Sequence, residues 1–176
     1  YERPEAERKE ALNRMMSGWK RRLTGTEEKW VTERKNRMDF LIEKAVELGV
    51  TDLHPIITER TEVRKLNTER IKAQIIEAAE QCERSDIPIL HPITQLSVLL
   101  QNPSFDYTIL AALERQDAPH LGMVGTEIGF MIGPEGGFSL EEIKILSNHP
   151  KIRAVSLGTR ILRAETAALY ILSKLG

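Results

Sequence analysis

The sequence predicts an α/β domain whose mainly parallel sheet is flanked by helices. Segments with apolar residues at helical spacing alternate with short runs that are typical of strands, and this alternation favours a parallel sheet covered by helices. A glycine-rich turn at 133–137 joins one of these runs to the start of a helix. The chain has 176 residues, enough for one well-buried domain with a small appendage.

The composition argues against a membrane protein and against a disulfide-rich one. Hydrophobic residues make up 41% and charged residues 29%, as in ordinary globular proteins. No apolar run approaches the roughly 20 residues of a membrane span, and the amino end does not resemble a signal peptide, so we expect no membrane partner. The single Cys82 cannot form an internal disulfide, which favours a structural thiol and a reducing compartment such as the cytoplasm.

The first part of the chain is basic and the rest is acidic. Residues 1–38 contain 11 Lys/Arg and 7 Asp/Glu, whereas residues 39–176 contain 14 and 19. We expect residues 3–23 to form a charged accessory helix, which is either solvated or in contact with phosphate. The predicted division is a charged helical segment at 1–30 and a main domain at 31–176.

The first half of the main domain contains two predicted helices and two predicted strands. In order, they are helix 37–50, strand 51–57, helix 67–84 and strand 87–93. Gly49 is the stop signal of the first helix, and Asn67 or Thr68 marks the start of the second. Prolines interrupt the second strand, as at a sheet edge.

The last third of the chain has the clearest pattern. Its predicted elements are strands 106–113 and 127–133, a helix from Leu140, strand 151–158 and a terminal helix at 164–175. Ser139 and Glu142 form a predicted capping box, and Phe138 with Ile143 a hydrophobic staple. The terminal helix begins with small residues on its apolar stripe, so we expect another element to pack closely against it.

The turn Gly133-Pro134-Glu135-Gly136-Gly137 is the first candidate ligand site. Open α/β sheets bind ligands at the carboxyl ends of their strands, where bare backbone N–H groups face a crevice. This turn lacks the Gly-Lys-Ser/Thr of a phosphate loop and the G-x-G-x-x-G of a dinucleotide fold. Pro134 stiffens it, Gly136 and Gly137 allow a positive φ, and Glu135 adds a negative charge. The alternative is a tight turn without a ligand.

A second turn of this kind lies at 156–169, after the next strand. Gly158 ends that strand, and Arg160 and Arg163 precede the terminal helix. Two arginines oppose the dipole at a helix amino end, and such a conflict often marks a functional site. The alternative is a structural salt bridge between arginine and Glu165.

Two motifs carry a resemblance to a known family. "IGPEGGFSLEEI" followed by "LGTRILRAETAAL" resembles the signature pair of the RsmE-type methyltransferases of the SPOUT superfamily, which methylate N3 of a uridine in small-subunit ribosomal RNA. Blocks at 37–63 and 77–88 are similar to the same family, so the resemblance covers about residues 35–176. It implies S-adenosylmethionine as cofactor, a carboxyl-terminal trefoil knot, a homodimer and a cytoplasmic location.

The two turns supply groups that suit this cofactor. S-adenosylmethionine is a cationic sulfonium, and its adenine favours backbone hydrogen bonds and apolar walls. The predicted cofactor-binding residues are Ile132, Gly133, Pro134, Glu135, Gly136, Gly137, Leu157, Gly158, Ile161, Leu162 and Thr166.

Methylation at uridine N3 requires removal of a proton and stabilisation of the anion. An arginine suits the anion, so Arg163 is the first catalytic candidate and Arg160 the second, with Glu165 as orienting partner or proton acceptor. Gln81 and Arg84 are expected on the RNA side. No metal is expected, because the four histidines, His54, His91, His120 and His149, lack ligand spacing.

Two other functions stay open at this stage. The chain could methylate another RNA, such as transfer RNA, or be a non-catalytic RNA-binding or ribosome assembly factor. The expected partners are small-subunit ribosomal RNA, in the subunit or an assembly intermediate, and a second copy of the chain. Family members usually carry an amino-terminal PUA-like RNA-binding barrel. Here the charged segment 1–30 is expected to be a remnant of that barrel or a linker to it, and Trp30 and Val31 are the only plausible strand pair in the stretch 24–36.

Overall fold

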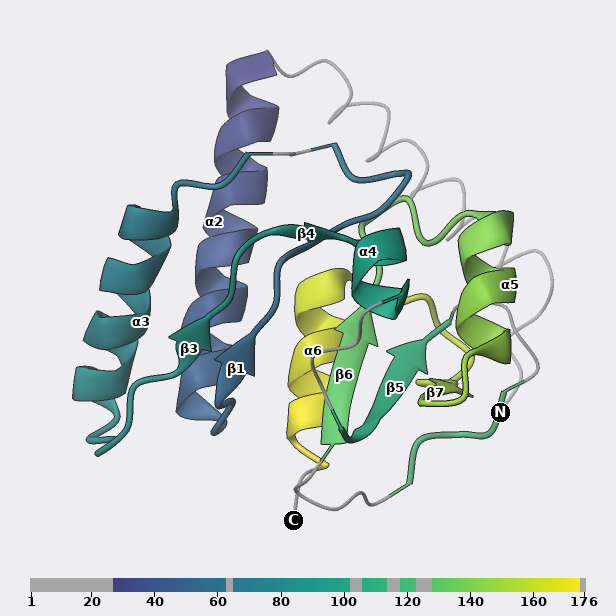
Figure 1. Ribbon diagram of the computed structural model, residues 1–176. Helices are drawn as coiled ribbons and strands as arrows, with labels where there is room; N and C mark the ends of the chain where they lie inside the picture. Colours follow the sequence, from purple (N-terminus) through teal and green to yellow (C-terminus); the bar gives the residue numbers. More distant parts are fainter. Residues whose placement is uncertain (1–26, 63–64, 102–105, 114–117, 123–127, 175–176) are drawn as a thin grey trace, which may run out of the picture. The chain divides into compact units, whose positions relative to one another are not determined.

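The computed structural model describes residues 27–62, 65–101, 106–113, 118–122 and 128–174, with side chains from residue 37 on (Figure 1). The helix predicted at 3–23 lies outside these residues. By its internal contacts the chain divides into two compact units, residues 1–37 and residues 38–176. The second unit carries the candidate site. None of the described helices is long and apolar enough to cross a bilayer.

Helix α2 (Glu27–Glu47) begins earlier than predicted. Its backbone runs through Trp30 and Val31, so the strand pair considered there is not formed. The segment contains neither proline nor glycine, and its many Glu, Lys and Arg residues favour a helix. The helix ends as predicted, because Gly49 has a φ of +89° and its N–H donates to Val46 O at 3.1 Å.

Helix α3 (Thr68–Gln81) begins where the sequence predicts. Asn67 is the N-cap, and its Oδ1 accepts a hydrogen bond from Arg70 N at 3.1 Å. The buried face of α3 forms one hydrophobic core with Ile42 and Val46 of α2. That face consists of Ile71, Ile75, Ala78 and Ala79.

The strand predicted at 51–57 is divided in two, and the one at 87–93 is shorter, with a further strand after it. The observed strands are β1 (Asp52–Leu53), β2 (Ile56–Ile57), β3 (Ile89–Leu90) and β4 (Thr94–Gln95). Strand β1 pairs with β3 and β2 pairs with β4, both in parallel. Pro55 and Pro92 lie at the interruptions, where a residue without an N–H group cannot continue a ladder.

The main sheet is parallel, in the order β6-β5-β7. It consists of β5 (Thr108–Ala112), β6 (Ile128–Ile132) and β7 (Ile152–Val155). Along β5 the side chains alternate between two cores: Ile109 and Ala111 join one, and Leu110 joins the other. The predicted α/β class with parallel strands is therefore confirmed.

Helices cover both faces of this sheet (Figure 1). Helix α5 (Leu140–Asn148) packs on β7, and helix α6 (Ala164–Leu172) packs on β6. Helix α4 (Leu96–Gln101) was not predicted. It spans 6 residues, too few to show a helical period, although Leu96 and Leu100 bury one face of it.

Candidate functional site

Both glycine-containing turns lie at the same edge of the main sheet. The first follows β6 and the second follows β7, the two strands on either side of β5. Because all three strands are parallel, their carboxyl ends meet at one edge, which is where open α/β sheets bind ligands. The topology therefore brings the two predicted halves of the cofactor site to one edge.

In the first turn, one glycine has the positive φ that the sequence predicts for two. Gly137 has a φ of +68°, and its N–H closes the turn by donating to Pro134 O at 2.7 Å. Gly136 has no positive φ, so the prediction for that residue is wrong. A single left-handed residue is enough to turn the chain into α5.

Gly133 and Gly137 differ in their surroundings. A Cβ on Gly133 would lie 3.0 Å from the Phe138 ring, so any larger residue would force that ring to shift. A Cβ on Gly137 would meet no atom of the described residues within 4 Å, so the backbone there faces open space in this part of the structure. The turn thus has room for a ligand beside Gly137.

A segment after β2 holds the first turn in place. Arg60 Nη1 donates a hydrogen bond to Gly136 O at 2.8 Å, and the Glu59 N–H donates to Glu142 Oε1 at 2.7 Å. The predicted capping box is confirmed, since Ser139 N donates to Glu142 Oε2 at 2.8 Å and Glu142 N to Ser139 Oγ at 3.3 Å. Sequence reasoning missed Arg60, although it lies within the block that carries the resemblance.

Hydrogen bonds within the second turn and from residues 119–121, which precede β6, stabilise this turn. Gly158 has a φ of +117°, and its N–H donates to Ser156 Oγ at 3.3 Å. Ser156 N donates to Pro119 O at 2.9 Å, and Leu121 N donates to Ser156 O at 2.9 Å. His120 therefore lies beside the turn, with Nε2 4.0 Å from the position of a Cβ on Gly158. The spacing of His120 in the sequence does not indicate this.

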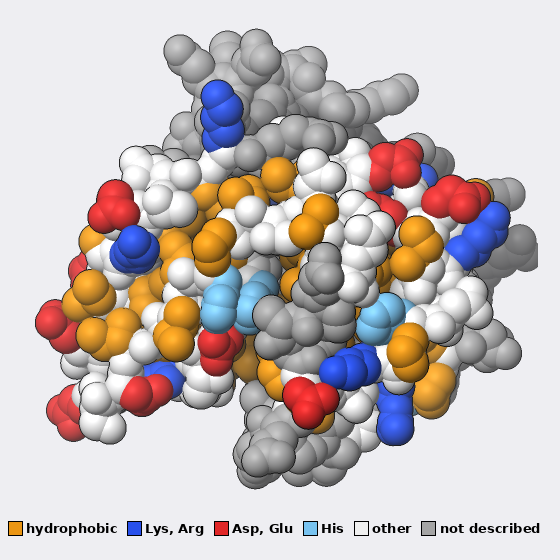
Figure 2. Space-filling model, in the orientation of Figure 1, with side chains coloured by type: hydrophobic (Ala, Val, Ile, Leu, Met, Phe, Trp, Pro, Cys, Tyr) orange, Lys and Arg blue, Asp and Glu red, His pale blue; other side chains and the backbone are white. Residues whose placement is uncertain are grey.

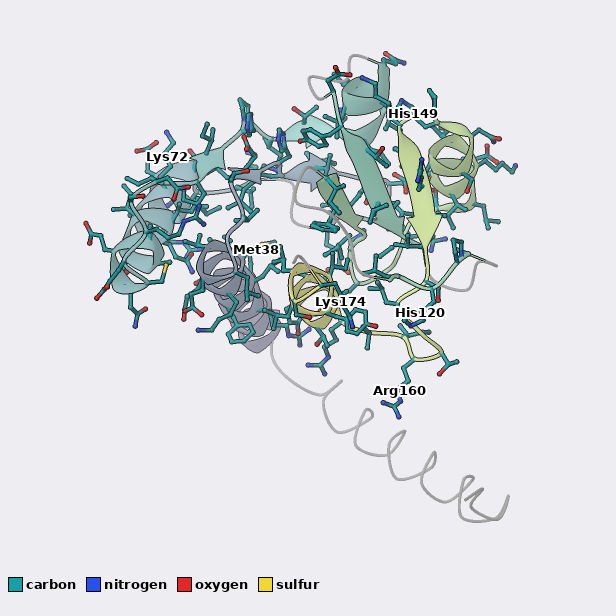
Figure 3. The ribbon with its side chains drawn as sticks, turned by 90° about the horizontal axis from the view of Figure 1, so that it is seen from below. Met38, Lys72, His120, His149, Arg160 and Lys174 are labelled. Carbon is teal, nitrogen blue, oxygen red and sulfur yellow. The ribbon has the colours of Figure 1, made fainter. Side chains whose placement is uncertain are left out.

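The two candidate arginines lie at the amino end of α6 and are exposed. Arg163 is the N-cap residue, with extended backbone and no side-chain capping bond. Arg160 projects away from the ribbon (Figure 3). Among the described residues neither forms an ion pair with Glu165, so the structural salt bridge considered from the sequence is not observed there. Two cationic groups thus stand at the positive end of a helix dipole.

The remaining predicted cofactor residues line the two turns. Ile132, Leu157 and Leu162 are half-buried, whereas Ile161 is 59% exposed. Glu135 and Thr166 are exposed. The four aliphatic side chains are candidates for apolar walls of a cofactor site.

The two residues predicted to bind RNA lie at the end of α3. Gln81 is exposed. Arg84 Nη1 donates to Val46 O and Val50 O, both at 2.8 Å, and its guanidinium pairs with Asp86. These contacts complete the carboxyl end of α2 and explain Arg84 without a ligand. Its role toward RNA stays a prediction.

Two of the four histidines lie together, although the four lack ligand spacing in the sequence. The rings of His54 and His91 stack with centroids 3.8 Å apart, and His91 Nε2 donates to Asp52 Oδ1 at 2.7 Å. The hydrogen bond from His91 lowers the pKa of Asp52, and burial lowers the pKa of His54. Pairing of β1 with β3 causes this contact, and sequence spacing does not report strand pairing.

Comparison with known proteins places these features in context. A family model described as an RNA methyltransferase domain matches residues 30–176. Proteins named ribosomal RNA small subunit methyltransferase E are similar: that of Rickettsia conorii is 30% identical over 145 residues, which cover 80% of this chain and 59% of the relative. That of Aquifex aeolicus is 33% identical over 148 residues, which cover 81% of this chain and 64% of the Aquifex protein. The chain thus spans about three fifths of the length of these relatives.

Solved structures of this kind resemble the chain in fold. The ribosomal RNA small subunit methyltransferase E of Neisseria gonorrhoeae, bound to S-adenosylmethionine, is 38% identical with a TM-score of 0.68. The match covers 78% of this chain and 59% of the Neisseria chain. A Legionella pneumophila protein described as a methyltransferase, also with bound S-adenosylmethionine, is 35% identical with a TM-score of 0.68. The match covers 78% of this chain and 59% of the Legionella chain.

Proposed function

Because the chain belongs to the family of RNA methyltransferase domains, we propose that it methylates N3 of a uridine in small-subunit ribosomal RNA, with S-adenosylmethionine as methyl donor. The observation that carries this proposal is the meeting of two open-backbone turns at one sheet edge, beside two exposed arginines. The names and bound cofactors of the similar proteins support it.

The residues of the two turns fit the cofactor. Among the residues that the structure describes, none comes within 4 Å of a Cβ on Gly137, and only His120 Nε2 comes within 4.0 Å of a Cβ on Gly158, so backbone can approach a bound adenosine at both places. Ile132, Leu157 and Leu162 offer apolar walls. When bound there, S-adenosylmethionine supplies an electrophilic methyl carbon next to a sulfonium leaving group.

The chain's own residues must prepare the uridine for attack. Removal of the N3 proton leaves a negative charge that spreads onto the two neighbouring carbonyl oxygens. We assign stabilisation of this charge to the Arg163 guanidinium, with Arg160 as second candidate. Glu165, in the first turn of α6, is the proposed proton acceptor or the group that orients Arg163. The exposure of both arginines leaves them accessible to RNA.

The proposal includes finer features of the family. These are a carboxyl-terminal trefoil knot, a homodimer, a cytoplasmic location, contacts from Gln81 and Arg84 to RNA, and the division into 1–30 and 31–176. The parallel sheet and the similar structures support the fold. The small-residue stripe of α6 gives the dimer less support, since Ala167 and Ala168 are buried within their own chain.

Mapping modified nucleosides by mass spectrometry tests the substrate. Ribosomal and transfer RNA from cells with and without the gene are digested and compared. We expect one 3-methyluridine in small-subunit ribosomal RNA to disappear and to return when the purified chain and cofactor are added. Loss of a modification in transfer RNA would favour a related methyltransferase instead. Unchanged RNA and no cofactor binding in a titration would favour an assembly factor.

A further inference from the structure

The pairing of β1 with β3 brings three metal-ligand side chains to one place outside the two turns. The register pairs Leu53 with Leu90, so the next residues, His54 and His91, follow side by side. The His91 N–H continues the ladder by donating to Leu53 O at 2.9 Å. Asp52 precedes His54 by two residues, which places both on the same face of an extended segment. The pairing of β1 with β3 therefore places the three side chains close together.

The three side chains are close enough to share one ion. Ligand atoms from Asp52, His54 and His91 all lie within 4.8 Å of one another. The imidazole planes are inclined by 11°, so the two rings lie nearly parallel as well as stacked. A tetrahedral zinc ion with bonds of about 2.0–2.1 Å holds its ligand atoms about 3.4 Å apart. The two rings must turn out of their stack to face one ion, because the nitrogen lone pairs of stacked imidazoles lie in nearly parallel planes.

We propose that Asp52, His54 and His91 bind a divalent transition-metal ion, with Zn²⁺ as the favoured ion. Two imidazole nitrogens and one carboxylate are ligands that zinc accepts, whereas Mg²⁺ and Ca²⁺ favour oxygen ligands. On binding, the ion takes the place of the proton between His91 Nε2 and Asp52 Oδ1, and that proton passes to solvent. The site joins two segments that are 37 positions apart in the chain.

A pocket next to the cluster leaves a fourth coordination position open. It has a volume of about 120 Å³, and its lining consists of His54, Pro55, Ile56, His91, Pro92, Thr94 and Leu99. This space suits a water molecule or a small anion as fourth ligand. On the face drawn in Figure 2, two adjacent histidine side chains lie beside an acidic one, so an ion can reach the site from solvent.

Zinc titration of the full chain tests this site. The chain is prepared without an affinity tag, treated with EDTA and exchanged into chelator-free buffer, and Zn²⁺ is added in a calorimeter. Co²⁺ provides a spectroscopic probe of the coordination geometry. We expect one ion per chain with a Kd of about 1 μM or tighter, and Co²⁺ absorption bands typical of a four-coordinate site.

Single substitutions assign the ligands. His54→Ala, His91→Ala and Asp52→Asn are each expected to weaken zinc binding by about tenfold to a hundredfold or more. His149→Asn is the matched control: it removes a histidine at the α5–β7 connection, and its amide oxygen can accept the Lys151 N–H as Nδ1 does now. This variant should bind zinc as the original chain does.

Melting temperature provides the second readout and controls for folding. Zinc should raise the melting temperature of the original chain and of His149→Asn, but not of His54→Ala. Asp52→Asn, nearly equal in shape, covers the case in which a histidine variant fails to fold. A Kd above about 100 μM, or equal zinc affinity in Asp52→Asn and the original chain, would overturn the proposal. The contact between His91 and Asp52 would then be a structural hydrogen bond without a metal role.

Discussion

At the scale of single residues, a substitution of the exposed Arg163 tests the proposed chemistry separately from cofactor binding. Among the described residues its side chain forms no capping bond and no ion pair, so its loss should leave α6 in place. Arg163→Ala should therefore lower single-turnover methylation of small-subunit ribosomal RNA by about two to three orders of magnitude, the range for one preorganised donor. The Kd for S-adenosylmethionine should change little.

Controls for this prediction come from the same chain. Arg153→Ala, which removes an exposed arginine from β7, should keep the original rate. Glu165→Gln should slow turnover without lowering the melting temperature if Glu165 handles the proton. An Arg163→Ala chain with the original single-turnover rate would move the catalytic role to Arg160.

Two adjacent glycines allow a second test at this scale. Gly137→Ala places a Cβ at a φ of +68° and in the open space beside the turn, so it should lower stability by about 1–2 kcal/mol and weaken cofactor binding. Gly136→Ala should be mild, because its φ is not positive and its Cβ would lie 3.4 Å from Arg60 Cβ. Thermal melting and cofactor titration of both variants measure the difference. Equal losses of stability and of cofactor affinity in the two variants would contradict this prediction.

Individual residues also show where sequence reasoning stops. The motif identified the two turns, because glycine and capping preferences are local. It did not distinguish Gly136 from Gly137, since which of two adjacent glycines has the positive φ depends on the geometry of the whole turn. Arg60, His120 and the His54–His91 stack were missed because their contacts depend on strand pairing and on segments distant in sequence.

At the scale of elements, helix α5 starts from a capping box that also receives a bond from outside. Glu142 accepts from Ser139 N and from Glu59 N, so the box links the helix to the segment after β2. Ser139→Ala should cost about 1 kcal/mol of folding free energy. For a chain of this length the melting temperature should fall by about 2–4 °C.

Ser147→Ala is the matched control for the cap, because Ser147 is exposed within the same helix. It should leave the melting temperature nearly unchanged. If Ser139→Ala and Ser147→Ala have the same melting temperature, the cap contributes no measurable stability.

The segment after β2 provides a second prediction at this scale. Arg60→Ala removes the donor to Gly136 O and leaves the turn less constrained. The loss of one hydrogen bond of about 1 kcal/mol corresponds to a roughly fivefold weaker Kd for S-adenosylmethionine. Calorimetry on Arg60→Ala, with Arg153→Ala as control, measures this change. An unchanged Kd would mean that the turn keeps its shape without Arg60.

Element types were predictable where the signal is local and long. Helices α3, α5 and α6 and strands β5 to β7 follow from periodicity, caps and β-branched runs. The early start of α2 and the presence of α4 were not predicted. In α2, Trp30 and Val31 favour a strand locally although they lie within a charged helix. Helix α4 has only 6 residues, too few to show a helical period in the sequence.

At the scale of the whole molecule, the strand order β6-β5-β7 brings the two glycine-containing turns to one edge of the sheet. Neither turn forms a site alone, since each offers only a few backbone groups. Parallel pairing of both strands with β5 aligns their carboxyl ends and turns two motifs that are about 25 residues apart into one candidate site. The sequence predicts parallel strands from their alternation with helices, but the strand order comes only from the structure.

The last prediction concerns cofactor binding by the chain as a whole. None of the residues assigned to S-adenosylmethionine belongs to the Asp52, His54 and His91 cluster, so the chain treated with EDTA should still bind the cofactor or its demethylated product. At a hundred times the Kd, binding stabilises the native state by about 2.7 kcal/mol, which corresponds to a rise of roughly 5–10 °C in melting temperature. Titration calorimetry and melting, each with and without Zn²⁺, measure this. Absence of heat and of any thermal shift at millimolar cofactor would contradict cofactor binding by this chain, whereas a requirement for Zn²⁺ would show that the metal cluster and the two turns act together.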